Sequence, residues 1–226
     1  MMEIVIDIET YRSDLSPEQQ AYRESGIMAP SNYKDPIKTK RAIEEKKRTL
    51  YGKDAFDPLY GRIIAIGYMI TDIDDIIVNP TVLIARDEKA LLIEFYKGLG
   101  KLDEPSGACY PITFNGTDFD IPFLNFRTMT HSITSHYRLQ SLVENDVRNL
   151  LAQKYVKKPE HTLEEYAMHF KLPKLYKGVT GKDIGRLWEE GFLESIVEHC
   201  KSNVVLTWQL YRKSNMYYFN AKRRPF

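Results

Sequence analysis

Alternating hydrophobic and polar residues at the start of the chain predict a β-strand. Along Ile4–Glu9, three isoleucines point to one face, while Val5, Asp7 and Glu9 point to the other. Further strands are expected where β-branched and apolar residues accumulate, at Arg62–Thr71, Ile76–Ile84 and Cys109–Phe114. The first two of these runs flank the polar turn Asp72–Asp75, which predicts a hairpin.

Apolar residues spaced three and four positions apart predict helices in other parts of the chain. Asp87–Leu99 carries one apolar stripe, Pro122 marks a helix start, and Thr162–Glu165 has the pattern of a capping box. The last long helix is expected at about Leu193–Arg212, with a buried stripe formed by Ile196, Cys200, Val204, Thr207 and Tyr211. Strands therefore come first and a mostly helical half, about 147–213, follows. This order predicts one α/β domain over residues 1–226 with a mixed sheet flanked by helices.

A charged segment, residues 11–58, interrupts the sheet pattern after the first strand. It contains a helical stretch at Lys38–Leu50, and between Lys34 and Lys53 there are eight basic residues against three acids. Such a surface favours contact with nucleic-acid phosphates. The alternative is a solvated helix stabilised by ion pairs such as Arg41–Glu45.

The composition excludes several classes of protein. The chain has 226 residues, 43% of them hydrophobic and 28% charged, with a formal net charge of +1, which excludes a strongly basic, histone-like protein. Cys109 and Cys200 form no CxxC pair, so a zinc ribbon and a disulfide scaffold are not expected. Reduced thiols in a cytoplasmic protein are expected instead. The longest apolar stretch, near Ile63–Ile70, is too short for a membrane span, and acids within the N-terminal apolar run argue against a secretory signal. No membrane partner is therefore expected.

Three acids are candidate metal ligands. Asp7 and Glu9 face the same way in an apolar strand, so each raises the cost of ionising the other, and a bound cation offsets that cost. The alternative places Glu9 in solvent at the strand end. Asp120 follows a strand and an Asn-Gly turn; it is either a helix N-cap or a further ligand aimed at Asp7, and Asp118 competes for that second role.

The last helix contributes a polar pair. His199 and Asn203 are four residues apart and therefore share one face of the helix, beside its buried stripe. This arrangement places them at the edge of a cleft. A structural, hydrogen-bonded histidine is the alternative for His199.

Taken together, these motifs resemble the DEDD superfamily of 3′→5′ exonucleases, most closely the proofreading exonuclease domain of family B DNA polymerases and its stand-alone relatives. The resemblance rests on Val5–Thr10, on Asn115-x-x-x-Phe119-Asp120-x-Pro122, on Asp57–Gly67 and on the late helix. It implies a ribonuclease H-like fold and a two-metal site that holds Mg²⁺ or Mn²⁺ through Asp7, Glu9, Asp120 and the residue at 203.

The late helix departs from the family pattern twice. The family has an acid where this chain has Asn203, and the polymerase-like branch has Tyr where this chain has His199. His199 is expected to orient or deprotonate the attacking water. An amide brings no negative charge, so slow or absent cleavage is expected. An introduced Asp→Asn change, a natural degenerate exonuclease, and replacement by Glu198 or another acid remain open as explanations.

Four further residues are candidate substrate contacts. Thr10 and Asn115 are expected to hydrogen-bond the terminal nucleotide, Phe119 to stack on a base or to fill the core, and Lys182, at a helix start, to contact phosphate. The expected function is a stand-alone, metal-dependent 3′→5′ exonuclease acting on single-stranded or frayed DNA. The alternatives are a non-catalytic nucleic-acid-binding module on the same fold and a 3′→5′ exoribonuclease.

Overall fold

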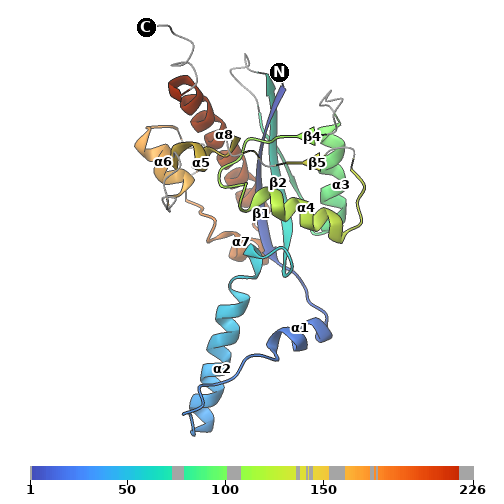
Figure 1. Ribbon diagram of the computed structural model, residues 1–226, viewed down its shortest axis with the longest axis vertical. Helices are drawn as coiled ribbons and strands as arrows, with labels where there is room; N and C mark the ends of the chain where they lie inside the picture. Colours follow the sequence, from blue (N-terminus) through green and yellow to red (C-terminus); the bar gives the residue numbers. More distant parts are fainter. Residues whose placement is uncertain are drawn as a thin grey trace. The chain divides into compact units, whose positions relative to one another are not determined.

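The computed structural model describes residues 2–72, 79–100, 108–135, 138–140, 142, 145–152, 161–173, 176 and 178–218. The chain divides into two compact units (Figure 1). Unit 1 consists of Met1–Glu9 and Ile63–Phe226, and unit 2 consists of Thr10–Arg62.

A three-stranded sheet in the order β1-β2-β3 forms the centre of unit 1. Its strands are β1 (Met2–Arg12), β2 (Gly61–Asp72) and β3 (Thr81–Ile84). β2 and β3 pair antiparallel, from Ala65↔Ile84 to Tyr68↔Thr81, which confirms the predicted hairpin. β3 begins at Thr81 rather than at Ile76; residues 73–78, which include most of the predicted turn, lie outside the described residues.

The predicted strand Cys109–Phe114 is wrong as a continuous element. β4 (Ala108–Cys109) pairs with β5 (Arg138–Leu139) in parallel and ends there. Pro111 follows, and proline has no N–H to donate to a strand ladder. Beyond it, single parallel bridges join Ile112 to Val5 and Thr113 to Asp146. The first bridge still ties the segment to β1, and the second ties it to the residue before α5.

Helices cover both faces of the sheet. They are α3 (Glu88–Leu99), α4 (Asp120–Thr130), α5 (Val147–Ala152), α6 (Leu163–His169), α7 (Ile184–Glu190) and α8 (Leu193–Tyr218). The predicted capping box at Thr162 and Glu165 is present. α8 is longer than predicted, and it contacts β3, α5, α6 and α7. An α/β fold is thereby confirmed.

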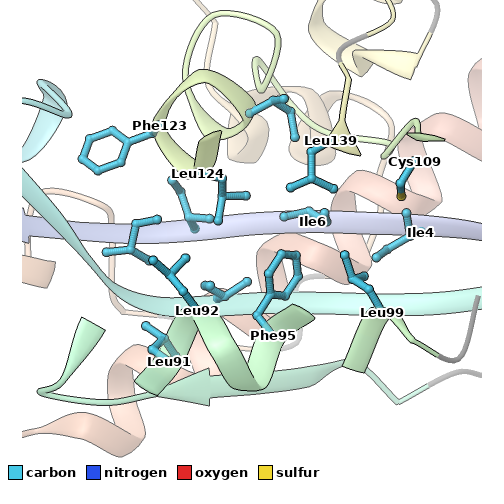
Figure 2. Close-up of a cluster of buried hydrophobic side chains, with 14 residues drawn as sticks. Ile4, Ile6, Leu91, Leu92, Phe95, Leu99, Cys109, Phe123, Leu124 and Leu139 are labelled. Atoms are coloured by element: carbon cyan, nitrogen blue, oxygen red, sulfur yellow. The ribbon is translucent and has the colours of Figure 1, made fainter. Parts of the chain in front are cut away.

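The alternation in β1 separates two hydrophobic clusters. Ile4, Ile6 and Ile8 pack with apolar residues of α3 and α4, as Figure 2 shows for Ile4 and Ile6. Val5, on the other face, packs with residues of α6 and α8. The predicted buried stripe of α8 is confirmed, because all five of its residues are at most 9% exposed.

Unit 2 has little hydrophobic core. Its helices are α1 (Pro17–Glu24), α2 (Pro36–Tyr51) and the short 3₁₀ helix η1 (Asp54–Phe56), and neither α1 nor α2 has a buried residue. Polar contacts join the two helices instead, since Glu24 accepts hydrogen bonds from Lys47 and Tyr51. Arg23 pairs with the buried Asp54 and stacks on the ring of Tyr60.

Both cysteines are free, as the sequence predicts, and both are buried. Among the described residues, the helices are too short or too polar for any of them to span a bilayer.

Candidate functional site

β1 places Asp7 and Glu9 on one side of the sheet. Glu9 is only 7% exposed, and β1 continues past it to Arg12. The alternative in which Glu9 ends the strand in solvent is therefore wrong. The buried carboxyl group of Glu9 is thus held beside the half-buried carboxyl group of Asp7.

The start of α4 brings Asp120 to the same strand. One carboxylate oxygen of Asp120 accepts a hydrogen bond of 3.0 Å from the backbone N–H of Ile8, between the two acids of β1. α4 begins at Asp120 itself and its N-cap position is Phe119, so the capping role considered for Asp120 is wrong. Asp118 is exposed, whereas Asp120 is 5% exposed. Asp120 is therefore the acid that joins the group.

Asp146 fixes the loop that leads into α4. Its buried carboxylate accepts hydrogen bonds of 3.0 Å from the backbone N–H groups of Asn115 and Thr117, and one of 2.6 Å from the Thr117 hydroxyl. These bonds hold Asn115 in a left-handed conformation, with φ of 64°. Asp146 could not be identified from the sequence, because no local pattern links it to a loop about 30 residues earlier.

α8 supplies His199 and Asn203 to the carboxylates. Nε2 of His199 lies 3.5 Å from Oε1 of Glu9, and His199 is 2% exposed. The amide nitrogen of Asn203 donates to Oδ2 of Asp7 at 3.3 Å and lies 3.3 Å from Nε2 of His199. The spacing of four residues thus directs both side chains at β1.

The structure consequently gathers all five residues expected to carry the chemistry: Asp7, Glu9, Asp120, His199 and Asn203. They come from β1, from the start of α4 and from α8. Glu198, considered as a replacement acid, pairs instead with Lys201 at 2.7 Å.

Burial makes the carboxyl groups difficult to ionise. Burial raises the pKa of Asp7 to about 7, against hydrogen bonds from Cys200 and Asn203 that lower it. Burial, and then the charge of Asp7, raise the pKa of both Glu9 and Asp120 well above the ordinary range. The three groups ionise together only if positive charge is supplied.

Glu164 of α6 adds to this negative field. Its charge contributes to the raised pKa of both Asp7 and Glu9. In the sequence, Glu164 lies within the predicted capping box. Only the packing of α6 against α8 brings its charge close enough to affect the carboxyl groups of β1. Local spacing carries no information on this relation.

Oxygen ligands dominate the group, and this donor set fits a hard divalent cation. Ligand atoms of Asp7, Glu9 and Cys200 lie within 4.8 Å of one another. Oε1 of Glu9 and Oδ1 of Asn203 are buried and accept no hydrogen bond from the described residues. Acceptors of this kind are typical ligands of Mg²⁺ or Mn²⁺.

Cys200 belongs to the packing rather than to the ligands. Burial and the neighbouring carboxylates raise the pKa of its thiol well above the ordinary value, so the thiol stays protonated. Its sulfur lies where a Cβ on Gly67 would approach to 2.6 Å. The glycine thus allows α8 to lie close against β2.

The expected substrate contacts have different surroundings. The hydroxyl of Thr10 donates to the carbonyl of Ala55 within unit 2. Oδ1 of Asn115 accepts a hydrogen bond of 2.8 Å from Arg148. Phe119 packs partly buried against the core, edge-on to Phe123 at 5.5 Å, as the core alternative predicted. Lys182 is exposed in a turn, two residues before α7 begins.

Comparison with known proteins gives one match. A family model described as a predicted 3′-5′ exonuclease related to the exonuclease domain of PolB matches residues 55–223. The matched range contains Asp120, His199 and Asn203, whereas Asp7 and Glu9 precede it. No curated protein and no solved structure matches the chain.

Proposed function

Because the chain belongs to the family of predicted 3′-5′ exonucleases related to the exonuclease domain of PolB, we propose that it is a metal-dependent 3′→5′ exonuclease that hydrolyses phosphodiester bonds at 3′ ends of single-stranded DNA. The observation that carries the proposal is the meeting of three carboxyl groups, the half-buried Asp7 and the buried Glu9 and Asp120, with His199 and Asn203. The parallel bridges at Ile112 and Thr113 support the ribonuclease H-like arrangement that belongs to it.

The ligands in this proposal are Asp7, Glu9, Asp120 and Oδ1 of Asn203. Two bound Mg²⁺ or Mn²⁺ ions would neutralise the scissile phosphate and make the attacking water more acidic. Oε1 of Glu9 and Oδ1 of Asn203 support this assignment, because both are buried and neither accepts a hydrogen bond from the described residues. A buried acceptor without a donor costs free energy, which a bound cation would offset.

His199 is proposed as the base. Its Nε2 faces Glu9 and Asn203, so a water held by these two groups lies within its reach. Nε2 takes one proton from this water as the oxygen attacks phosphorus. The bond from phosphorus to the 3′ oxygen breaks, that oxygen takes a proton from solvent water, and a nucleoside 5′-monophosphate leaves. His199 then releases its proton to solvent.

A non-catalytic nucleic-acid-binding module is the second candidate. One observation favours it: at position 203, where the family has a charged ligand, this chain has an amide whose N–H donates to Asp7. An amide oxygen binds a divalent ion more weakly than a carboxylate does. The proposed enzyme is therefore slow.

A shortening assay distinguishes the two candidates. Single-stranded DNA and an RNA of the same sequence, each labelled at the 5′ end, are incubated with Mn²⁺, with and without EDTA. The exonuclease gives a ladder of products shortened from the 3′ end, which EDTA and Asp7→Asn abolish. Binding without EDTA-sensitive shortening selects the second candidate, and faster shortening of the RNA assigns the activity to RNA.

A further inference from the structure

Unit 2 lies almost entirely outside the matched family range, so its role is not given by the family. The match begins at residue 55, and unit 2 covers Thr10–Arg62. The long helix α2 carries six basic residues and only two acids. A helix this long with no buried residue contributes little to a core, so its surface chemistry requires another explanation.

One face of α2 is occupied by α1 and its neighbouring loop. Lys47 and Tyr51 bond to Glu24, the carbonyl of Leu50 accepts from Arg23, and Lys46 donates to the carbonyl of Met28. These residues lie on one side of the helix, since Lys46 and Leu50 are four positions apart and so are Lys47 and Tyr51.

The opposite face of α2, which we call the outer face, presents Lys38, Arg41 and Arg48. The three residues follow the 3–4–3 spacing of one helical stripe, with Glu45 between them, and all three side chains are exposed. They span about 15 Å at about 1.5 Å per residue. Among the described residues, Lys38, Arg41 and Arg48 form no ion pair. The Arg41–Glu45 ion pair expected for a merely solvated helix is thus not formed.

Unit 2 also exposes aromatic rings. Unit 2 holds six of the twelve large hydrophobic side chains that are exposed among the described residues, including Tyr22 (81%), Tyr33 (42%) and Phe56 (68%). Exposed cations that form no ion pair among the described residues suit a single-stranded nucleic acid, because cations contact its phosphates, and exposed aromatic rings such as Tyr22 and Tyr33 can stack on its unpaired bases.

On the premise that the chain acts on nucleic acid, as proposed above, we propose that the outer face of α2 binds the sugar-phosphate backbone of a single strand. This face supplies affinity that does not depend on base sequence. An acidic protein is the competing occupant.

The test is equilibrium binding of a fluorescent oligo-dT to the full chain in EDTA, so that no cleavage occurs, between about 50 and 200 mM salt. The variant Lys38→Gln/Arg41→Gln/Arg48→Gln is compared with Lys89→Gln/Lys97→Gln/Arg212→Gln, which removes three exposed cations of unit 1. We expect the α2 variant to bind about tenfold more weakly at low salt. Its log–log salt slope should be smaller by about 2, since each single-strand phosphate contact contributes about 0.7.

Equal loss in both variants, an unchanged salt slope in the α2 variant, or a stronger effect on binding of poly-glutamate than of oligo-dT overturns the inference. Circular dichroism of α2 variants establishes that α2 remains folded. The outcome is separate from the proposed function: a wild-type chain that binds as expected but shortens no substrate with Mn²⁺ refutes the exonuclease and leaves the binding face in place.

Discussion

Asn203→Asp tests the candidate site most directly, because it changes one atom at the position where the chain departs from its family. In the absence of metal, the substitution removes an N–H donor to Asp7 and brings a second acid to within about 3.3 Å of its carboxylate. Two unit charges at that distance repel by about 5 kcal/mol at an effective dielectric constant of about 20. Proton uptake relieves most of this repulsion. The free energy of unfolding in EDTA should therefore fall by about 1–3 kcal/mol.

With Mn²⁺ bound, the effect of Asn203→Asp is expected to be favourable instead of unfavourable. The added carboxylate supplies charge where Asn203 supplies only an amide oxygen, so cation binding and cleavage both improve. We expect Mn²⁺-dependent shortening to accelerate at least about tenfold, which corresponds to about 1.4 kcal/mol of transition-state stabilisation. Single-turnover shortening of a 5′-labelled oligonucleotide, measured across a Mn²⁺ titration, gives both the rate and the metal dependence. Thermal unfolding with and without Mn²⁺ gives the stability.

Asn125→Asp is the matched control. It makes the same chemical change on an exposed position of α4, where the amide contacts the carbonyl of Leu139 rather than a carboxylate. It should leave the rate and the Mn²⁺ dependence unchanged. Equal rates for the wild type and Asn203→Asp would remove position 203 from the mechanism. If Glu164→Gln abolished cleavage in that case, the fourth acid would lie on α6.

Three further predictions concern stability. Because burial raises the pKa of Asp7 to about 7, the metal-free folded state holds a proton that the unfolded chain loses near pH 4, so stability should fall as pH rises from about 4 to 7. For Asp7 the upper bound of this loss is about 4 kcal/mol at about 1.4 kcal/mol per pKa unit, and partial exposure reduces it. In urea unfolding, Asp7→Asn should show a shallower pH slope than the wild type, with the remaining slope coming from Glu9 and Asp120, whose pKa values burial also raises; an equal slope in both proteins would contradict this. Arg127→Met should lower the free energy of unfolding by about 3–5 kcal/mol, because it leaves the buried Glu88 carboxylate without a partner that bonds it at 2.6 Å; a change below about 1 kcal/mol would contradict this. Gly67→Ala should destabilise by about 1–3 kcal/mol through its clash with Cys200, and the additional change Cys200→Ala should restore part of the loss, as thermal unfolding of the three variants would show.

The local elements were predictable from the sequence because each depends on residues a few positions apart. The alternation in β1, the apolar stripes of α3 and α8 and the capping box before α6 all have the predicted form. The facing of His199 and Asn203 also follows from their spacing alone. The broken strand after Cys109 is an instructive failure, since Pro111 interrupts the ladder within an apolar run.

Tertiary structure decided which polar residues meet. Asp120 reaches the N–H of Ile8 across 112 positions of sequence, and Asp146 holds the loop at Asn115 from a distant segment. The packing of Cys200 on Gly67 and the charge of Glu164 near β1 likewise depend on how α8 and α6 lie against the sheet. Periodicity specifies a residue's face within its own element. It carries no information on which other element closes over that face, because that choice depends on packing between segments far apart in the chain.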